Sequence, residues 1–286
     1  MSIKVENISF TYDKKTPNSY EALKNVSLEI KDHSFTGIVG HTGSGKSTLV
    51  QMLNGLLMPN EGRIIVDNFV LEGGKKKPKN IRELRKHVGL VFQFPEYQLF
   101  EETVEKDVAF GPKNFGASLE ESLKKAHETL GLLGLGESYY QRSPFELSGG
   151  EKRKVALAGI LAIGPEILIL DEPTAGLDPK SAKEVMALIA KLHDEGKTIV
   201  VITHDMDLLF RYCDHAILLK DGKVEFDGNP DDLFDGDLDN LSIEVPKMYE
   251  FFQVLKSHGV IVPHDKVKTI GDLAKFLAER RGNSNE

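Results

Sequence analysis

The fold of this chain is decided by residues 40–47, which read Gly40-His41-Thr42-Gly43-Ser44-Gly45-Lys46-Ser47. The stretch matches the pattern G-x-x-x-x-G-K-[ST], whose glycines let successive backbone N–H groups curl around phosphate oxygens. A β-type run, Phe35–Val39, precedes it and a helix-type segment begins near Lys46, which is the context that the pattern requires. We expect the Lys46 amine to reach the β- and γ-phosphates of a nucleotide and the Ser47 hydroxyl to bind Mg²⁺.

A second apolar run, Ile167–Leu170, is followed directly by two acids, Asp171 and Glu172. Asp171 would hold Mg²⁺ through water. Glu172, with an ordinary pKa of about 4.3, would be ionised and placed to polarise an attacking water. Acids that follow buried strands often only cap helices. The assignment of Asp171 and Glu172 to a nucleotide site therefore depends on residues 40–47, which we call the phosphate loop.

The spacing between the two motifs indicates an inserted helical segment. Asp171 lies 125 residues after Lys46, which is too far for a simple GTPase core. Apolar residues recur at helical spacing from Leu119 to Leu133, and Ser118 with Glu121 forms a capping-box pattern at the start of that segment.

Composition excludes several classes of protein. The 286 residues carry a net charge of −8, which argues against a general nucleic-acid binder. The single cysteine, Cys213, excludes a disulfide framework and a cysteine-based zinc site, and it fits a reducing compartment. There is no uninterrupted run of about 18 apolar residues, and the N-terminal residues lack the pattern of a signal peptide. We therefore expect a soluble, cytosolic chain.

The remaining segments predict an α/β chain with a C-terminal addition. Apolar residues partly alternate in Ile3–Phe10 and Val26–Ile30, as in half-buried strands, whereas Ile167–Leu170 and Ile199–Ile202 are apolar on both faces, as in a covered parallel sheet. Residues 216–226 read as a hairpin. Beyond Gly228 the composition becomes acidic and turn-rich, and two short amphipathic helices follow. We place the main domain at 1–228, an extension at 229–286 and the boundary near 228–245.

A third motif, Leu147-Ser148-Gly149-Gly150-Glu151, lies 23 residues before Asp171, counted from Ser148. Taken alone it is as well explained by an ordinary helix cap. In this position it resembles the signature motif of ATP-binding-cassette (ABC) ATPases. Gln93 then resembles the Q-loop glutamine, Ala175-Gly176-Leu177-Asp178 the D-loop and His204 the switch histidine, while Tyr12 sits where the family stacks an aromatic ring on adenine. The resemblance covers about residues 3–228. One departure is Glu151, where the family usually has Gln.

The resemblance implies a RecA-like P-loop core with an N-terminal antiparallel β subdomain and a helical subdomain at roughly 94–165. It also implies a head-to-tail dimer in which each ATP lies between the phosphate loop of one chain and the signature motif of the other. The implied catalytic residues are Glu172, His204 and Gln93, and the implied Mg²⁺ ligands are Ser47, Gln93 and Asp171. The implied ATP contacts are Tyr12, Gly40, His41, Thr42, Gly43, Ser44, Gly45, Lys46, Ser47, Thr48, Ser148, Gly149, Gly150, Glu151 and Asp178.

A further stretch narrows the family. Residues 92–104 contain Phe94-Pro95-Glu96-Tyr97-Gln98-Leu99-Phe100, and Phe110-Gly111-Pro112 follows. This sequence resembles the corresponding stretch in the ATPases of energy-coupling-factor transporters. Among them it is most similar to the second of two paralogous subunits. The resemblance implies ATP-driven uptake of vitamins or other micronutrients, peripheral attachment to the cytoplasmic face of the membrane, and no nucleic-acid partner. The implied partners are a paralogous ATPase or a second copy, a substrate-binding membrane subunit, and a membrane scaffold contacted by about residues 94–110. The extension at 229–286 would take part in dimerisation.

The segment from Glu96 to Asp107 holds five acids and one base, a local charge of −4. Because the implied scaffold helices carry arginines, we expect some of these acids to pair with them. The alternative is a solvated acidic loop. The run at 75–79, KKKPK, is interpreted as a solvated loop as well.

Three other functions remain to be weighed. The first is an ABC importer of another type, such as a cobalt or nickel uptake system. The second is a soluble ABC protein of DNA repair, chromosome maintenance or translation, but such proteins usually carry two cassettes, long coiled coils or zinc cysteines. The third is a P-loop kinase or GTPase, against which stand the 125-residue spacing and the absence of an Asn-Lys-x-Asp motif.

Overall fold

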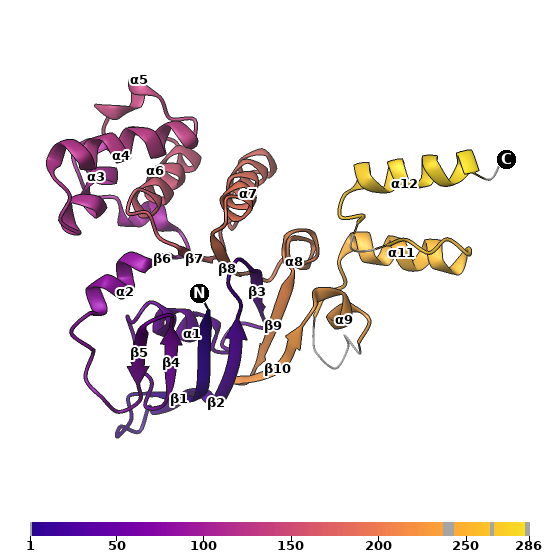
Figure 1. Cartoon of the computed structure of the whole chain (residues 1–286), viewed down its shortest axis with the longest axis horizontal. Helices are drawn as coiled ribbons and strands as arrows, with labels where there is room; N and C mark the ends of the chain where they lie inside the picture. Colours follow the sequence, from indigo (N-terminus) through magenta and orange to yellow (C-terminus); the bar gives the residue numbers. More distant parts are fainter. Residues whose placement is uncertain (1, 237–242, 264–265, 284–286) are drawn as a thin grey trace.

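A six-stranded sheet forms the centre of the computed structural model, which describes residues 2–236, 243–263 and 266–283 (Figure 1). The strand order is β10-β9-β3-β8-β7-β6. The pairs β9–β3, β3–β8, β8–β7 and β7–β6 are parallel, and only β10 runs antiparallel to its neighbour. The strands are β3 (Phe35–Val39), β6 (Val88–Val91), β7 (Ile167–Asp171), β8 (Thr198–Ile202), β9 (His215–Lys220) and β10 (Lys223–Gly228).

Alternate residues of these strands enter two different hydrophobic cores, which explains why the strands are apolar on both faces. In β7, Leu168 and Leu170 join a core with helices α3 to α8, whereas Ile167 and Ile169 join a core with α1 and the second sheet. The helices around the sheet are α1 (Lys46–Leu53), α2 (Ile81–His87), α7 (Pro179–Asp194) and α8 (Met206–Tyr212). None of the helices in the described ranges is long and apolar enough to cross a membrane.

The second sheet is antiparallel, in the order β2-β1-β4-β5, as expected for the N-terminal subdomain. Its strands are β1 (Ile3–Tyr12), β2 (Tyr20–Ile30), β4 (Glu61–Val66) and β5 (Phe69–Glu72). The sequence pattern found β2 only from Val26 onwards and did not single out β4 and β5. In the structure β2 begins six residues earlier, because Tyr20 and Glu21 pair with Tyr12 and Thr11 of β1.

The predicted helical insertion is present and gathers above the central sheet in Figure 1. It comprises α3 (Val104–Asn114), α4 (Leu119–Leu132), α5 (Glu137–Tyr140) and α6 (Gly149–Leu161), with single 3₁₀ turns at Pro95–Gln98 and Pro144–Glu146. The predicted capping box at the start of α4 is confirmed: the Glu121 amide donates to Ser118 Oγ at 3.2 Å and the Ser118 amide donates to Glu121 Oε2 at 2.9 Å.

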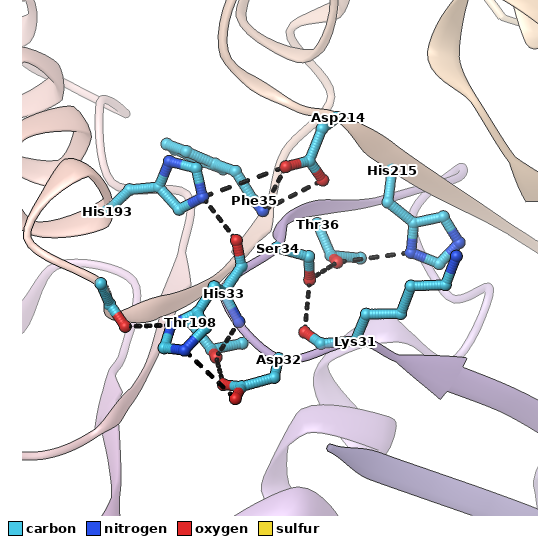
Figure 2. Close-up of polar contacts among 11 residues, drawn as sticks. Lys31, Asp32, His33, Ser34, Phe35, Thr36, His193, Thr198, Asp214 and His215 are labelled. Carbon is cyan, nitrogen blue, oxygen red and sulfur yellow. Dashed lines mark hydrogen bonds and ion pairs between the residues drawn. The ribbon is translucent and has the colours of Figure 1, made fainter. Parts of the chain in front are cut away.

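The turn between β2 and β3 ties the amino-terminal edge of the parallel strands together (Figure 2). The His33 amide donates to Thr198 Oγ1 at 3.0 Å, and that hydroxyl donates to Asp32 Oδ1 at 3.3 Å. The Phe35 amide donates to both carboxylate oxygens of Asp214 at 3.1 Å. These contacts join the starts of β3, β8 and β9. At the carboxyl ends, the strand pairing sets Ile38 opposite Ile202 and Val39 opposite Leu218.

The C-terminal segment consists of α9 (Pro230–Phe234), α11 (Lys247–Ser257) and α12 (Ile270–Asn283). In Figure 1, α11 and α12 lie at the other end of the molecule from the helical insertion. Phe252 is 2% exposed and packs edge-on against Phe210 of α8 at 5.8 Å, whereas its neighbour Phe251 is 48% exposed. The tail is therefore anchored on its own chain. Part of the predicted boundary, residues 237–242, lies outside the described residues.

This contrast predicts different effects of two adjacent substitutions. Phe252→Ala empties a packed site and should lower the free energy of unfolding by about 3–5 kcal/mol. Phe251→Ala removes the same ring from a largely solvated position and should change it by less than about 0.5 kcal/mol. Chemical denaturation of both full-length variants measures the difference. Equal losses would mean that the tail does not pack on α8.

Candidate active site

The phosphate loop connects β3 to α1, and its backbone requires glycine. Gly45, the residue before α1, has φ of 105°, and a Cβ there would lie 2.6 Å from the Ala22 carbonyl oxygen. Among the described residues no side chain caps α1, so the first N–H groups of this helix are available to an anion. The Lys46 amine donates to the loop carbonyls of Gly40 at 2.6 Å and His41 at 2.9 Å.

Two of the three predicted metal ligands, Ser47 and Asp171, meet at the carboxyl edge of the sheet. Because β3, β8 and β7 are parallel neighbours, their carboxyl ends lie on the same edge. The Ser47 hydroxyl donates to Asp171 Oδ2 at 3.1 Å. Burial raises the pKa of the Asp171 carboxyl; the Glu172 carboxylate also raises it, while the Ser47 hydrogen bond opposes the shift. A positive charge beside Asp171 would therefore be stabilised.

Glu172 and His204 form a close pair at the same edge. His204 Nδ1 lies 2.7 Å from Glu172 Oε1, with the glutamate side chain 13% exposed and the histidine side chain 79% exposed. Glu172 adopts a left-handed backbone with φ of 50°, which is rare for a residue with a Cβ. Its amide donates to the Ile202 carbonyl at 2.9 Å, which fixes the turn to the end of β8.

These residues line one cavity of about 370 Å³. Burial lowers the pKa of the Lys46 amine, and the carboxylates of Glu172 and Asp171 oppose that shift. Ten of the residues predicted for the site line the cavity: Thr42, Gly43, Gly45, Lys46, Ser47, Thr48, Gln93, Asp171, Glu172 and His204. Gly40, His41 and Ser44 belong to the same loop but do not line the cavity.

An aromatic residue that sequence reasoning missed also lines the cavity. Tyr20, at the start of β2, is 52% exposed and its hydroxyl donates to the Gly43 carbonyl at 2.9 Å. Tyr12, predicted to stack on adenine, is not among the lining residues, and its hydroxyl lies 3.1 Å from Thr48 Oγ1. In the sequence, Tyr20 is only an aromatic residue after the polar loop at 13–19. It belongs to no motif with a fixed spacing, so no pattern assigns it to the site.

The signature residues lie outside this cavity, at the start of α6. Ser148 caps the helix, because its hydroxyl accepts from the Glu151 amide at 3.4 Å. In return the Ser148 amide and hydroxyl donate to Glu151 Oε2 at 2.8 and 2.7 Å. The Tyr139 hydroxyl donates to Glu151 Oε1 at 2.8 Å. The hydrogen bonds from the Ser148 side chain and backbone and from Tyr139 lower the pKa of Glu151 to about 2. The unusual fifth signature residue is thus an ionised cap.

Asp178 lies beside the signature motif. It caps α7 by accepting from the amides of Lys180 at 3.0 Å and Ser181 at 3.1 Å. A Cβ on Gly150 would lie 3.6 Å from the Ser181 hydroxyl, so the starts of α6 and α7 are adjacent. The residues predicted to bind ATP thus fall into two sets. Most of the phosphate loop lines the cavity, whereas Ser148–Glu151 and Asp178 lie outside it.

Comparison with known proteins decides the family. The sequence model of the ABC transporter family matches residues 23–175. The energy-coupling factor transporter ATP-binding protein EcfA2 of Streptococcus agalactiae is 51% identical over 265 residues, which cover 92% of this chain and 94% of that protein. The chain belongs to the ATP-binding proteins of energy-coupling factor transporters. EcfA2 of Mesoplasma florum is 46% identical over 280 residues, covering 97% of this chain and 89% of that protein.

Solved structures agree with this assignment. CbiO1 from Clostridium perfringens, part of the ABC transporter complex cbiONQ, is 40% identical with a TM-score of 0.71 and covers 82% of this chain and 90% of its own. MJ0796, a dimeric cassette bound to ADP and Pi, is 35% identical with a TM-score of 0.71 and covers 80% of this chain and 98% of its own.

The predicted family, the resemblance to the second paralogue and the α/β fold are thus confirmed. The chain is an ABC-type ATPase and the energising subunit of an energy-coupling factor transporter. The relatives do not favour the alternative, an importer of another type such as a cobalt or nickel system.

The Glu172–His204 pair predicts a measurable shift at the histidine. The hydrogen bond and charge of Glu172 raise the pKa of His204 above 6.5, so the pair stabilises the folded chain fully below about pH 6.5 and progressively less as the pH rises through the raised pKa. In Glu172→Gln the His204 pKa should fall towards its ordinary value. An NMR titration that follows the imidazole carbons of His204 measures its pKa in the wild type and in Glu172→Gln. If the two pKa values are equal, Glu172 and His204 do not pair in solution.

Proposed function

We propose that this ATPase drives the uptake of vitamins or other micronutrients, from the cytoplasmic face of the membrane, through a membrane scaffold and a substrate-binding membrane subunit. The observation that carries the proposal is the meeting of Lys46, Ser47, Asp171 and Glu172 in one cavity. The names of the relatives, which are transporter ATP-binding proteins, support the transport role.

The donors around Ser47 fit Mg²⁺. The Ser47 hydroxyl and the Asp171 carboxylate offer hard oxygen ligands close together, and the Gln93 side chain lines the same cavity. When held there, Mg²⁺ would supply positive charge that offsets the negative charge developing on the phosphates during hydrolysis.

The residues of the chain itself bind the phosphates and activate the water through their positions and charges. The N–H groups at the start of α1 and the Lys46 amine hold the phosphates of ATP. Glu172 orients the attacking water and accepts its proton. His204 is largely exposed and hydrogen-bonded to Glu172. It holds that carboxylate and would face the γ-phosphate of bound ATP. In-line attack of water on the γ-phosphate is then catalysed mainly by preorganised electrostatics.

The signature residues complete the site of a partner chain. Ser148 and Gly149 are exposed, lie outside the cavity and stand at the positive end of α6. In a head-to-tail dimer this end would face the ATP held by the phosphate loop of the partner, which is a paralogous ATPase or a second copy. MJ0796, a related cassette, is dimeric.

The tail offers a second contact for the dimer. Its exposed apolar residues include Val254 at 52% on α11, Ile261 at 74% after α11 and Ile270 at 77% at the start of α12. Large exposed apolar side chains on one segment favour association with another surface. We place part of the dimer interface there.

The surface at about 94–110 is the proposed scaffold contact. Its aromatic side chains are exposed: Tyr97 by 85%, Phe100 by 55% and Phe110 by 43%, with the Phe100 and Phe110 rings packed edge-on at 4.9 Å. Exposed aromatic residues of this kind are typical of interface anchors.

Only some of the acids in this segment are available to arginines of a scaffold. Asp107 accepts from the amides of Phe100 and Glu101, both at 2.9 Å. Glu105 is hydrogen-bonded to His127 at 2.8 Å. Glu102, whose side chain is 84% exposed, is paired at the surface with Lys106 at 3.0 Å. One oxygen of Glu96, Oε2, is buried. We therefore take Glu101 and Glu102 as the coupling acids.

Reversing these two charges should separate ATP binding from transport. Glu101→Lys with Glu102→Lys should leave the ATP affinity of the isolated subunit within about twofold, because neither residue lines the cavity. Assembly with the scaffold should be lost, since each buried charge without a partner costs a few kcal/mol. Co-purification with the membrane subunits and vitamin uptake measure the two consequences.

A matched control makes the same charge change on α4. Glu120→Lys with Glu128→Lys alters two exposed acids of the same subdomain and should leave assembly and uptake intact. Normal assembly and uptake by the Glu101/Glu102 variant would show that the segment is only a solvated face.

A further inference from the structure

A buried arginine connects the signature helix to the turn that carries Glu172. Arg153 lies in the second turn of α6 and is only 4% exposed. Its guanidinium donates to the Glu172 carbonyl at 3.2 Å and to the Ala175 carbonyl. A guanidinium is a rigid fork of donors, so two bonds to one turn fix the orientation of that turn more firmly than one bond would.

The turn that Arg153 holds is strained. Glu172 has φ of 50°, a conformation that persists in a residue with a Cβ only where surrounding contacts enforce it. Within the turn, the Ala175 amide donates to the Glu172 carbonyl at 3.1 Å. Two contacts come from outside the turn: the bond from the Glu172 amide to the Ile202 carbonyl and the bond from Arg153 to the Glu172 carbonyl. The side chain of Glu172 leaves this same backbone, so the two contacts together set where its carboxylate and His204 lie.

Arg153 also touches the loop that follows Gln93. Its guanidinium carbon lies 5.9 Å from the centre of the Phe94 ring, and Phe94 likewise has a left-handed backbone, with φ of 54°. A Cβ on Gly176 would lie 3.3 Å from that ring, so Phe94 packs on the turn as well. The start of α6, the loop after β6 and the turn after β7 thus meet at one side chain.

The charge of Arg153 is incompletely balanced. Burial lowers the pKa of its guanidinium, and the carboxylate of Glu96 opposes that shift. One oxygen of Glu96, Oε2, is buried and has no hydrogen-bond partner among the described residues. Although the carboxylate of Glu96 is nearby, the guanidinium of Arg153 donates its hydrogen bonds to backbone carbonyls of the Glu172 turn.

We propose that Arg153 is a positioning residue for hydrolysis, which holds the Glu172–Ala175 backbone so that the Glu172 carboxylate faces the attacking water. This rests on the proposed role of Glu172. Arg153 belongs to α6 of the helical insertion and contacts Phe94. A displacement of the insertion therefore moves the Glu172–Ala175 turn, and with it the Glu172 carboxylate.

The test compares four variants of the full-length chain in its assembled ATPase. Arg153→Met keeps the apolar stem and removes every donor, and Arg153→Lys keeps the charge but can reach only one carbonyl at a time. Lys154→Met is the matched control, since it removes a neighbouring cation that pairs with Glu184 at 2.9 Å away from the turn. Glu172→Gln is the reference for loss of the water-orienting group and should lower kcat by about 10²-fold or more.

Arg153→Met should lower kcat by about 10- to 100-fold, because a displacement of about 1 Å at a catalytic group has effects of that size. The KM for ATP should stay within about threefold, since the phosphate loop is untouched. Arg153→Lys should recover part of kcat at unchanged KM, and this variant carries the test if Arg153→Met fails to fold. Lys154→Met should behave as the wild type.

A second-site change distinguishes positioning from simple charge balance. If Arg153 only neutralises Glu96, adding Glu96→Gln to Arg153→Met restores kcat, and the proposal is overturned. If Arg153 holds the turn, kcat stays low in the double variant. Near-normal kcat in Arg153→Met alongside a collapsed Glu172→Gln would also overturn the proposal and leave the role of Glu172 standing. Normal turnover in Glu172→Gln would instead remove the premise that Glu172 acts on the water.

Discussion

The site depends on one contact, the hydrogen bond between Ser47 and Asp171, which joins residues 124 positions apart in the sequence. It exists because β3 and β7 flank β8 in a parallel sheet, so the loop after one strand and the acids after another reach the same edge. The apolar residues that enter both cores hold this arrangement from the two faces of the sheet. Nothing local in either segment would bring the two together.

The arrangement is electrostatically incomplete by itself. Asp171 and Glu172 are adjacent acids, and burial and mutual repulsion raise the pKa of Asp171. Lys46 and the uncapped start of α1 supply positive potential on the other side. A polyphosphate with its cation would balance both, which supports the proposal that this cavity binds ATP with a carboxylate next to the reacting phosphate. By contrast, α6 and α7 begin with side-chain caps from Ser148 and Asp178. In the proposed head-to-tail dimer these helix starts face the ATP of the partner chain.

Sequence patterns predicted the parts of the site that are local. The strand–loop–helix around residues 40–47 and the strand before Asp171 each encode their structure within a few residues, and both are present in the structure. The same holds, outside the site, for the capping box at Ser118. Tyr20 and Arg153 were missed because their importance arises from residues that are distant in the sequence. Tyr20 matters through its bond to Gly43, and Arg153 through a turn 19 residues away that only tertiary packing brings near. The short strands β4 and β5 were missed because their pairing partners, not their composition, define them.

The central claim is that each ATP is held between two chains, and complementation between chains tests it most directly. Dimers in which every chain carries Lys46→Ala, or every chain carries Gly149→Asp, have both sites damaged. In a mixed dimer, with Lys46→Ala in one chain and the signature lesion in its partner, both lesions fall in one composite site and the other site is intact. ATPase activity of purified, differently tagged dimers should therefore be higher in the mixed dimer than in either parent. Activity no higher than that of the parents would contradict a site shared between chains.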